Sequence, residues 1–198
     1  MVGERWALLV IRELLLGPKR FVDLRAGLPA VSQNVLARRI RELEQAGLVI
    51  RILLEPPANI PAYQLTARGL QLRATLIELA RWGAFEPEPE GADQSPAALL
   101  LGLSALYDPS RIDTRTTGVL KMGRESFTLT ASRERLQLER GDSVADFTVT
   151  GSAGAIRATL GKGFDVTPYE ANGELTIAGD RASFERLSRC FPVPVLSP

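Results

Sequence analysis

The chain has 198 residues, of which 45% are hydrophobic and 24% charged, a composition typical of a folded globular protein with one large or two modest cores. It contains no histidine and one cysteine, Cys190. These counts exclude an internal disulfide and a histidine-based catalytic triad, and they leave almost no zinc ligands. The acidic residues are scattered, and no spacing singles out a general acid and a general base. We therefore expect a protein that is not an enzyme and that uses no metal and no cofactor.

The longest apolar runs, at residues 7–11, 14–16 and 97–101, are too short to span a bilayer, and the N-terminus shows no secretion signal. We expect a cytoplasmic protein without membrane insertion. The net charge of +1 is unevenly distributed, because residues 1–84 hold 12 basic residues against 7 acidic ones, whereas residues 85–198 hold 12 against 16. The excess in the first part is consistent with phosphate attraction, although a solvated surface would also explain it.

Two helices are predicted at the start of the chain. Residues 4–16 carry apolar side chains at helical spacing and end at Gly17-Pro18, through which no helix continues. A second, short helix follows to about residue 26, and Gly27-Leu28-Pro29 ends it. A short helix, a tight turn and a third helix form the sequence pattern of a helix-turn-helix.

The third helix, over residues 32–47, has clear limits. Ser32 is a good N-cap and Gly47 a good helix stop. Between them Leu36, Ile40 and Leu43 recur at the spacing of a helix with one buried stripe. We therefore predict one amphipathic helix of about four turns.

The face opposite this stripe is polar, and it consists of Asn34, Arg38, Arg41 and Gln45, flanked by Gln33 and Ala37. An arginine fork can donate to guanine O6 and N7, and the amide of asparagine or glutamine can bond adenine N6 and N7. A helix that presents such groups from its N-terminal half suits the DNA major groove. The alternative is that this face is merely solvated, as most polar helix faces are.

A β-hairpin and a further helix follow. Residues 48–55 form an apolar, β-rich run, and residues 62–66 form a second one after the breaker stretch at residues 56–61. Thr66 then caps a helix that runs through Trp82. Three helices, a two-stranded wing and a closing helix make a winged helix-turn-helix domain.

Four motifs occur in order over roughly residues 3–84: GERWALLVIRELLLGPKRF, LP-x-VS-x-x-x-LARRIRELEQAGLVIR, YQLTARGLQL and RWG. Together they resemble the HxlR-type winged-helix transcriptional regulators of prokaryotes. The resemblance implies a homodimer that binds double-stranded operator DNA as two half-sites. It places Ser32, Gln33, Asn34, Ala37 and Arg38 at the front of the reading helix, Lys19 and Arg20 where the preceding helix meets phosphate, and Arg51 at the base of the wing. With Arg41 from the polar face, these are the predicted DNA-binding residues.

The sequence departs from this family pattern at two places. Family members usually begin with a further helix that contributes to the dimer interface, whereas Met1 here lies two residues before Gly3. Either the start is misassigned, the chain is truncated, or dimerisation depends on the helix over residues 66–82. The wing tip, PPANIP, carries no basic residue, so Arg51 is left to make a backbone contact from lower down the wing.

The composition changes after residue 84. Residues 85–96, FEPEPEGADQSP, are an acidic, Pro-rich linker, and residues 192–198 form a Pro-rich tail. Between them a second domain over residues 97–191 is predicted to open with a helix over 97–107. It continues with an antiparallel meander over 112–120, 126–131, 135–139 and 146–150, then a helix capped at Ser152, a strand over 173–178 and a helix capped at Asp180.

This order of elements, with FTVTGSAGAIRATL, GELTIAGD and ASFERLSRCF in sequence, resembles the sterol-carrier-protein fold. The resemblance implies an apolar tunnel for a small-molecule effector, lined by Leu103, Leu106, Phe127, Leu129, Phe147, Val149, Ile156 and Leu160. The alternative is that these side chains are ordinary core, because no polar constellation marks a ligand head group. Tyr107 and Tyr169 are candidates to anchor a polar end. Cys190 is expected to be a buried, small apolar residue rather than a redox sensor.

We therefore predict an α+β protein, with a winged helix-turn-helix domain over residues 1–84 and a sterol-carrier-protein-like domain with a mainly antiparallel five-stranded sheet over residues 97–191. Its predicted function is sequence-specific regulation of transcription, controlled by an apolar small molecule that favours one dimer geometry. The alternative is a lipid or sterol carrier whose winged helix serves as a tether or a protein-interaction module. If the winged helix is a protein-interaction module, loss of Arg38 and Arg41 should leave binding of its partner intact.

Overall fold

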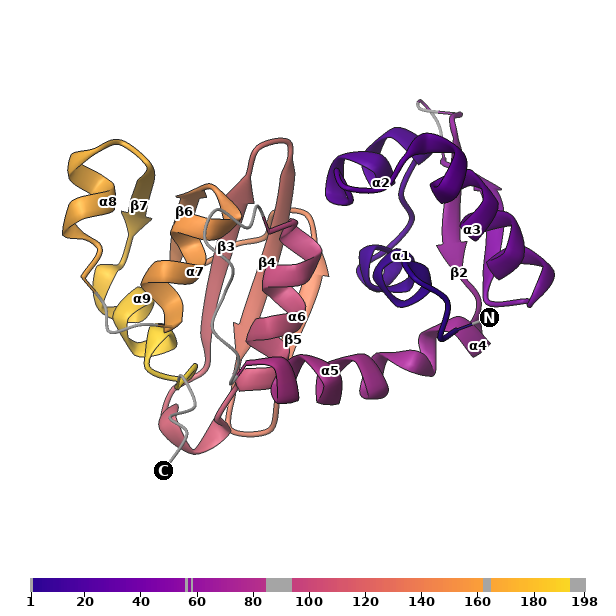
Figure 1. Ribbon diagram of the computed structural model, residues 1–198. Coiled ribbons are helices and arrows are strands. Elements are labelled where there is room, and N and C mark those ends of the chain that lie inside the picture. The colour runs from indigo at the N-terminus through magenta and orange to yellow at the C-terminus, as the bar shows by residue number, and fades with distance from the viewer. Residues whose placement is uncertain (1, 56, 58, 85–93, 162–164, 193–198) are drawn as a thin grey trace. The chain divides into compact units, whose positions relative to one another are not determined.

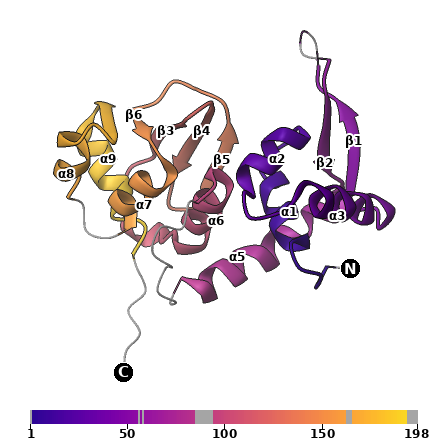
Figure 2. The ribbon, with the colours of Figure 1, turned by 45° about the horizontal axis from the view of Figure 1, so that its top comes forward.

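The computed structural model describes residues 2–55, 57, 59–84, 94–161 and 165–192. The chain divides into two compact units, Met1–Leu79 and Ala80–Pro198, whose elements are labelled in Figures 1 and 2. Most of the predicted linker, residues 85–93, and most of the predicted tail, residues 193–198, lie outside the described residues. No helix within the described ranges has both the length and the apolar character needed to cross a membrane.

The first unit contains the predicted elements in the predicted order. Helices α1 (Ala7–Leu14), α2 (Phe21–Gly27) and α3 (Gln33–Gln45) are followed by the antiparallel hairpin of β1 (Val49–Leu53) and β2 (Pro61–Leu65), then by α4 (Ala67–Leu70) and α5 (Leu72–Gly83). Helix α5 continues past Leu79 into the second unit. Two boundaries differ from the prediction. Helix α1 starts only after Trp6, whose φ of 76° is incompatible with an α-helix, and the helix predicted over residues 66–82 is divided at Gln71.

Helix α3 has the limits that its capping residues predict. The Ser32 Oγ accepts a hydrogen bond from the Val35 N–H at 3.4 Å. At the other end Gly47 adopts φ +67°, its N–H bonds the Glu44 carbonyl at 2.9 Å, and the Leu48 N–H bonds the Leu43 carbonyl at 3.0 Å. This pair of bonds is a Schellman motif, which satisfies the last carbonyls of the helix and turns the chain into β1.

The core of the first unit forms where α1, α2 and α3 meet. Leu36, Ile40 and Leu43 of α3 are at most 1% exposed, as the predicted stripe requires, and Leu24 of α2 is fully buried with them. Because this stripe is buried, the opposite side of α3 is directed to solvent.

A buried ion pair connects α1 to the segment before α2. The Lys19 Nζ lies 2.9 Å from the Glu13 Oε2, and the two side chains are 3% and 0% exposed. The Lys19 N–H also bonds the Tyr63 carbonyl at 3.0 Å, and the Tyr63 N–H bonds the Lys19 carbonyl at 2.8 Å. Lys19 thus links α1, the helix-turn-helix and strand β2 of the wing.

The second unit begins with α6 (Pro96–Leu106) and the 3-10 turn η1 (Pro109–Arg111). Strands β3 (Thr116–Met122), β4 (Glu125–Ala131), β5 (Leu136–Arg140) and β6 (Phe147–Gly151) follow, and the unit closes with α7 (Ala153–Gly161), α8 (Thr167–Ala171), β7 (Leu175–Gly179) and α9 (Arg181–Ser188). The predicted caps of α7 and α9 are present, because Ser152 Oγ accepts from the Ala155 N–H and Asp180 Oδ1 accepts from the Ala182 N–H. The elements η1 and α8 are additions to the predicted order.

The prediction of an antiparallel meander is wrong for β6. Within the described residues the sheet has the order β5-β4-β3-β6-β7, and β6 pairs with β3 in parallel instead of following β5. The other three pairings, β3 with β4, β4 with β5 and β6 with β7, are antiparallel, so the sheet is mixed.

Burial explains this strand order. Five of the seven residues of β3 are buried, whereas no residue of β5 is. A meander would leave apolar β3 at a sheet edge and place half-polar β5 inside, so pairing β6 with β3 buries the more apolar strand. Gly118 permits the parallel pairing, since a Cβ there would lie 2.3 Å from the Cζ of Phe147, its register partner.

The helices α6, α7 and α9 lie on one face of this sheet (Figure 1). Residues of the strands that point toward them, such as Leu120, Phe127 and Val149, are fully buried, and the rings of Phe147 and Phe184 meet edge to face at 5.5 Å. The opposite face is rich in threonine.

Candidate DNA-binding surface

The outer face of α3 is exposed and polar. Ser32, Gln33, Asn34, Arg38, Arg41 and Gln45 are exposed, and Ala37 is half-buried. All six exposed side chains can donate a hydrogen bond, and the hydroxyl and amide groups can accept one as well. This is the arrangement that the helical spacing predicts.

The two arginines of this face are held only loosely. The Arg38 side chain is 63% exposed, and its Nε lies 3.8 Å from the Glu42 Oε1 on the next turn. The Arg41 Nε donates to the Ala37 carbonyl at 3.3 Å. Exposed contacts of this kind are weak and exchange readily with water, so both guanidinium groups can be offered to an incoming ligand.

The neighbouring Arg39 belongs to the interior instead. Its side chain is 5% exposed and makes ion pairs with Glu42 and with Glu4, whose Oε2 lies 3.4 Å from the Arg39 Nη2. The helical spacing of α3 does not predict this burial, because Arg39 falls beside the apolar stripe and not within it. The contact fixes the segment before α1 against α3.

Lys19 does not lie on the candidate surface, contrary to the sequence expectation that it meets phosphate. Its side chain is directed inward to Glu13, for the reason that its backbone is paired with Tyr63 at the edge of the wing. An ammonium group that is 3% exposed and 2.9 Å from a carboxylate is not available to a nucleic acid in this conformation.

Arg20 is partly exposed but already paired. It precedes α2, and its Nε and Nη2 each donate to one carboxylate oxygen of Asp23 at 2.7 Å, with the side chains 39% and 34% exposed. The hydrogen bond from Arg20 lowers the pKa of Asp23 below its ordinary value of 3.8. The pair caps α2, so part of the Arg20 charge is compensated within the protein.

Arg25 is a candidate that the sequence analysis did not name. It lies exposed near the end of α2, and its Nη1 donates to the Gln33 Oε1 at 3.5 Å. Arg25 therefore brings a positive charge to the first turn of α3 and orients the amide of Gln33. The available signal was its position on the outer face of α2, eight residues before Gln33.

Arg51 is exposed on β1, opposite Tyr63 in the hairpin register. The wing also exposes apolar side chains, with Leu53 67% and Ile60 38% exposed. Two residues of the predicted tip, 56 and 58, lie outside the described residues. Arg51 thus remains the basic group that the described part of the wing presents.

In the second unit the predicted tunnel residues form the core. Leu103, Phe127, Leu129, Phe147, Val149, Ile156 and Leu160 are at most 4% exposed, and Leu106 is half-buried. They pack between the sheet and its helices. The apolar tunnel therefore stays a prediction, because burial of these side chains fits both a core and a closed tunnel.

The groups proposed to anchor a polar ligand end are placed differently. The Tyr107 hydroxyl donates to the Ser132 carbonyl at 2.6 Å, and burial raises the pKa of Tyr107. Tyr107 therefore connects the end of α6 to the β4–β5 turn, whereas Tyr169 lies half-buried on α8. Cys190 is buried, and that burial raises the pKa of its thiol to about 11, which disfavours the reactive thiolate.

Comparisons with known proteins match the first unit. The family described as HxlR-like helix-turn-helix matches residues 1–90. The transcriptional regulator YodB of Bacillus subtilis is 40% identical over 90 residues, which are 45% of this chain and 80% of YodB. The regulator YvaP of the same species, whose role is uncharacterised, is 36% identical over 94 residues, which are 47% of this chain and 86% of YvaP.

Two solved structures are similar to parts of the chain. The reduced form of YodB from Bacillus subtilis has 40% sequence identity and a TM-score of 0.38, over 44% of this chain and 86% of that one. The sec-alkylsulfatase Pisa1 from Pseudomonas sp. has 16% identity and a TM-score of 0.45, over 50% of this chain and 16% of that one.

Proposed function

The chain belongs to the HxlR-like helix-turn-helix family of DNA-binding transcription regulators, and from this premise we propose that it reads operator DNA with α3 in the major groove. The observation that carries the proposal is the outer face of α3, where Gln33, Asn34, Arg38 and Arg41 are exposed on a helix that Ser32 caps. These side chains match the donor and acceptor pattern of base edges.

The roles of the other candidates follow from their surroundings. Arg25 and Arg51 are exposed on α2 and on the wing, so we assign them to phosphate. Arg20 would have to exchange its bond with Asp23 for one with DNA, which makes its contribution smaller. Lys19 is left out because it is buried against Glu13.

We propose that the protein binds as a homodimer on a palindromic site. Large apolar side chains are exposed on α4 and α5, with Leu70 43%, Leu79 45% and Trp82 71% exposed. Contiguous exposed apolar groups mark interaction surfaces, and Leu79 and Trp82 are neighbours at i, i+3 spacing on α5. They support the sequence hypothesis that this region contributes to dimerisation. Because such a regulator acts on the chromosome, a cytoplasmic location is part of the same proposal.

The second unit is proposed to have a sterol-carrier-like fold and to carry an effector. The support is its order of elements, with a helix, a sheet, α7, β7 and α9 in sequence and helices on one face of the sheet. The eight apolar residues predicted to line the tunnel are packed together, so an apolar effector would have to displace their side chains. An effector controls DNA binding only if its affinity differs between two conformations of the dimer.

Selection from a pool of random duplexes with the full chain tests the proposal. We expect a palindrome whose half-sites are centred about 10 base pairs apart and bound at least about a thousandfold more tightly than a scrambled duplex. Fluorescence anisotropy at two salt concentrations then separates phosphate contacts from base contacts. Equal affinity for selected and scrambled duplexes, unchanged by Arg38→Ala, would contradict the proposal.

A further inference from the structure

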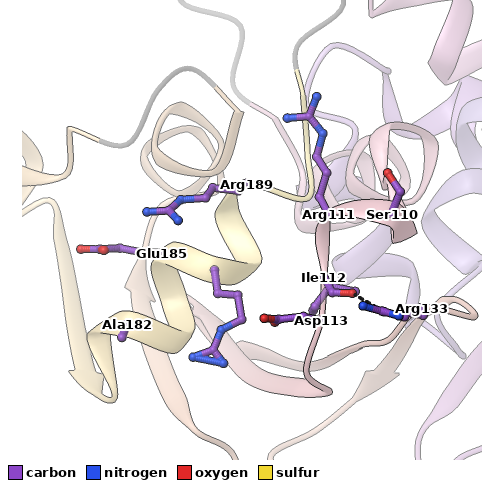
Figure 3. A pocket seen from close by; sticks show the side chains of 9 residues that line it. Ser110, Arg111, Ile112, Asp113, Arg133, Ala182, Glu185 and Arg189 are labelled. Carbon is purple, nitrogen blue, oxygen red and sulfur yellow. Dashed lines mark hydrogen bonds between the residues drawn. The ribbon is translucent and has the colours of Figure 1, made fainter.

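The second unit contains an open, charged pocket that no predicted role uses. Its volume is about 400 Å³, within the usual range for small-molecule sites. Figure 3 shows its lining, which consists of Ser110, Arg111, Ile112, Asp113, Arg133, Ala182, Glu185, Arg186 and Arg189. Four arginines and two acidic residues line the pocket, and Asp108 beside it forms an ion pair with Arg111 at 2.9 Å, so four positive charges meet three negative ones.

Segments far apart in the sequence build the two walls. One wall is a single face of α9 and its C-terminal end. On this face Ala182 is followed by Glu185 and Arg186, three and four residues later, and then by Arg189. The other wall is η1 with the residues before β3, next to Arg133 from the turn between β4 and β5.

The two walls are fixed to each other from beneath. The Asp108 N–H donates to the Cys190 carbonyl at 2.8 Å, and the rings of Tyr107 and Phe191 lie 5.8 Å apart. The Tyr107 hydroxyl in turn bonds the β4–β5 turn at Ser132. All three segments of the lining are therefore held in place by buried or half-buried contacts, which makes the pocket a preformed feature of the fold.

Two of the arginines are oriented through one nitrogen only. The Arg111 Nε donates to the Asp108 Oδ2 at 2.9 Å, and the Arg133 Nε donates to the Ile112 carbonyl at 3.2 Å, the contact dashed in Figure 3. Neither guanidinium has a further hydrogen bond to the described residues, so the terminal N–H groups of both remain free to bind a ligand.

The side chains of Arg186 and Arg189 have no hydrogen bond or ion pair within the described part of the chain. This contrasts with arginines elsewhere in the unit, such as Arg181, which forms two bonds with Glu170 at 3.0 and 2.8 Å. Guanidinium groups that line one concavity without a protein partner are available to bind carboxylate and phosphate groups.

We propose that this pocket binds a small, multiply charged organic anion, of the polycarboxylate or phosphate-ester class, through Arg111, Arg133, Arg186 and Arg189. A small molecule fits better than a nucleic acid backbone, because Asp113 and Glu185 share the pocket and would repel a continuous row of phosphates. The same two carboxylates accept hydrogen bonds from hydroxyl groups of the ligand. The proposal is independent of operator reading, since every residue of the pocket belongs to the second unit.

Isothermal titration of the full chain with citrate and with inorganic pyrophosphate, at constant ionic strength, tests the proposal and separates the two ligand classes. We expect saturable binding of at least one of them with one site per chain. Arg186→Gln and Arg189→Gln should each weaken binding by about tenfold, because each removes charge-assisted hydrogen bonds. Arg124→Gln, a change at an exposed arginine outside the pocket, should leave binding unchanged.

Replacing an acidic residue of the pocket lining should change the anion affinity in the opposite direction from replacing an arginine. Glu185→Gln should tighten binding of the same anion several-fold, which a loss of folding cannot do. The absence of saturable heat with both anions would overturn the proposal, as would equal heats from the wild type and the Arg186→Gln, Arg189→Gln double variant. If the double variant weakens DNA binding and its salt dependence instead, the pocket is a DNA contact and the proposal is wrong.

Discussion

The two units use their basic residues in different ways. Around the helix-turn-helix, Lys19, Arg20 and Arg39 are held by carboxylates that lie nearby in the fold, at 2.9 Å for Lys19 and 2.7 Å for Arg20. Around the pocket of the second unit, Arg186 and Arg189 have no such partner within the described residues. A basic residue that is buried against an acid, such as Lys19, is therefore less available for binding than one without such a partner.

The largest effect is expected from breaking the most buried pair. Glu13→Ala would leave the Lys19 ammonium buried without its carboxylate, which should lower the free energy of unfolding by about 3–5 kcal/mol. Urea unfolding followed by tryptophan fluorescence measures this loss. Glu55→Ala, at an exposed acid of the wing, is the matched control and should change stability by less than about 0.5 kcal/mol. Equal midpoints for the two variants would show that the pair does not stabilise the first unit.

Adjacent arginines of α3 sharpen the comparison between free and paired charges. Arg38→Ala should weaken operator binding by about 1–3 kcal/mol and relax base preference, because the side chain is 63% exposed. Arg39→Ala should instead lower stability and leave base preference unchanged, since its partners are Glu4 and Glu42. Anisotropy with single-base variants of the selected operator measures both effects. The reverse assignment of the two variants would refute the orientation of α3.

The smallest effect is expected from the exposed pair of Arg20 and Asp23. The pKa of Asp23 is lower in the folded than in the unfolded state, so the pair stabilises the protein above pH 3.8 and loses this effect as the pH falls through the folded pKa. Because both side chains are partly exposed, water screens the pair and its contribution to stability should be small. Unfolding measured from pH 6 to pH 3 should show a shallower fall for Asp23→Asn than for the wild type. Parallel curves would contradict the pairing.

Local signals in the sequence predicted most of the elements. Ser32, Thr66, Ser152 and Asp180 each cap the helix that the sequence assigned to them, because a hydroxyl or carboxylate that accepts from the next turn acts over three residues. The buried stripe of α3 and the exposed polar face opposite it follow from the helical period alone. The outer face of the candidate DNA-binding surface was therefore determined locally.

Contacts between distant residues escaped this reasoning. The inward orientation of the Lys19 side chain depends on backbone pairing with Tyr63 in the wing, and the burial of the Arg39 side chain depends on Glu4 before α1. Neither partner is marked by any spacing within the motif. The same holds for the apolar residues of the second unit, since a core and a tunnel have the same sequence pattern and only the packing distance between helices and sheet separates them.

The sequence by itself determined the family motifs, the capped helices, the winged hairpin and the number of strands in the sheet, because each depends on neighbours within a few positions. The tertiary structure decided that β6 pairs with β3, which basic residues remain unpaired, and that η1, the β4–β5 turn and α9 enclose one charged pocket. Strand order follows from which strand must be buried on both sides, and charge availability follows from which acid the fold brings near. Both are properties of the assembled chain and not of any one segment.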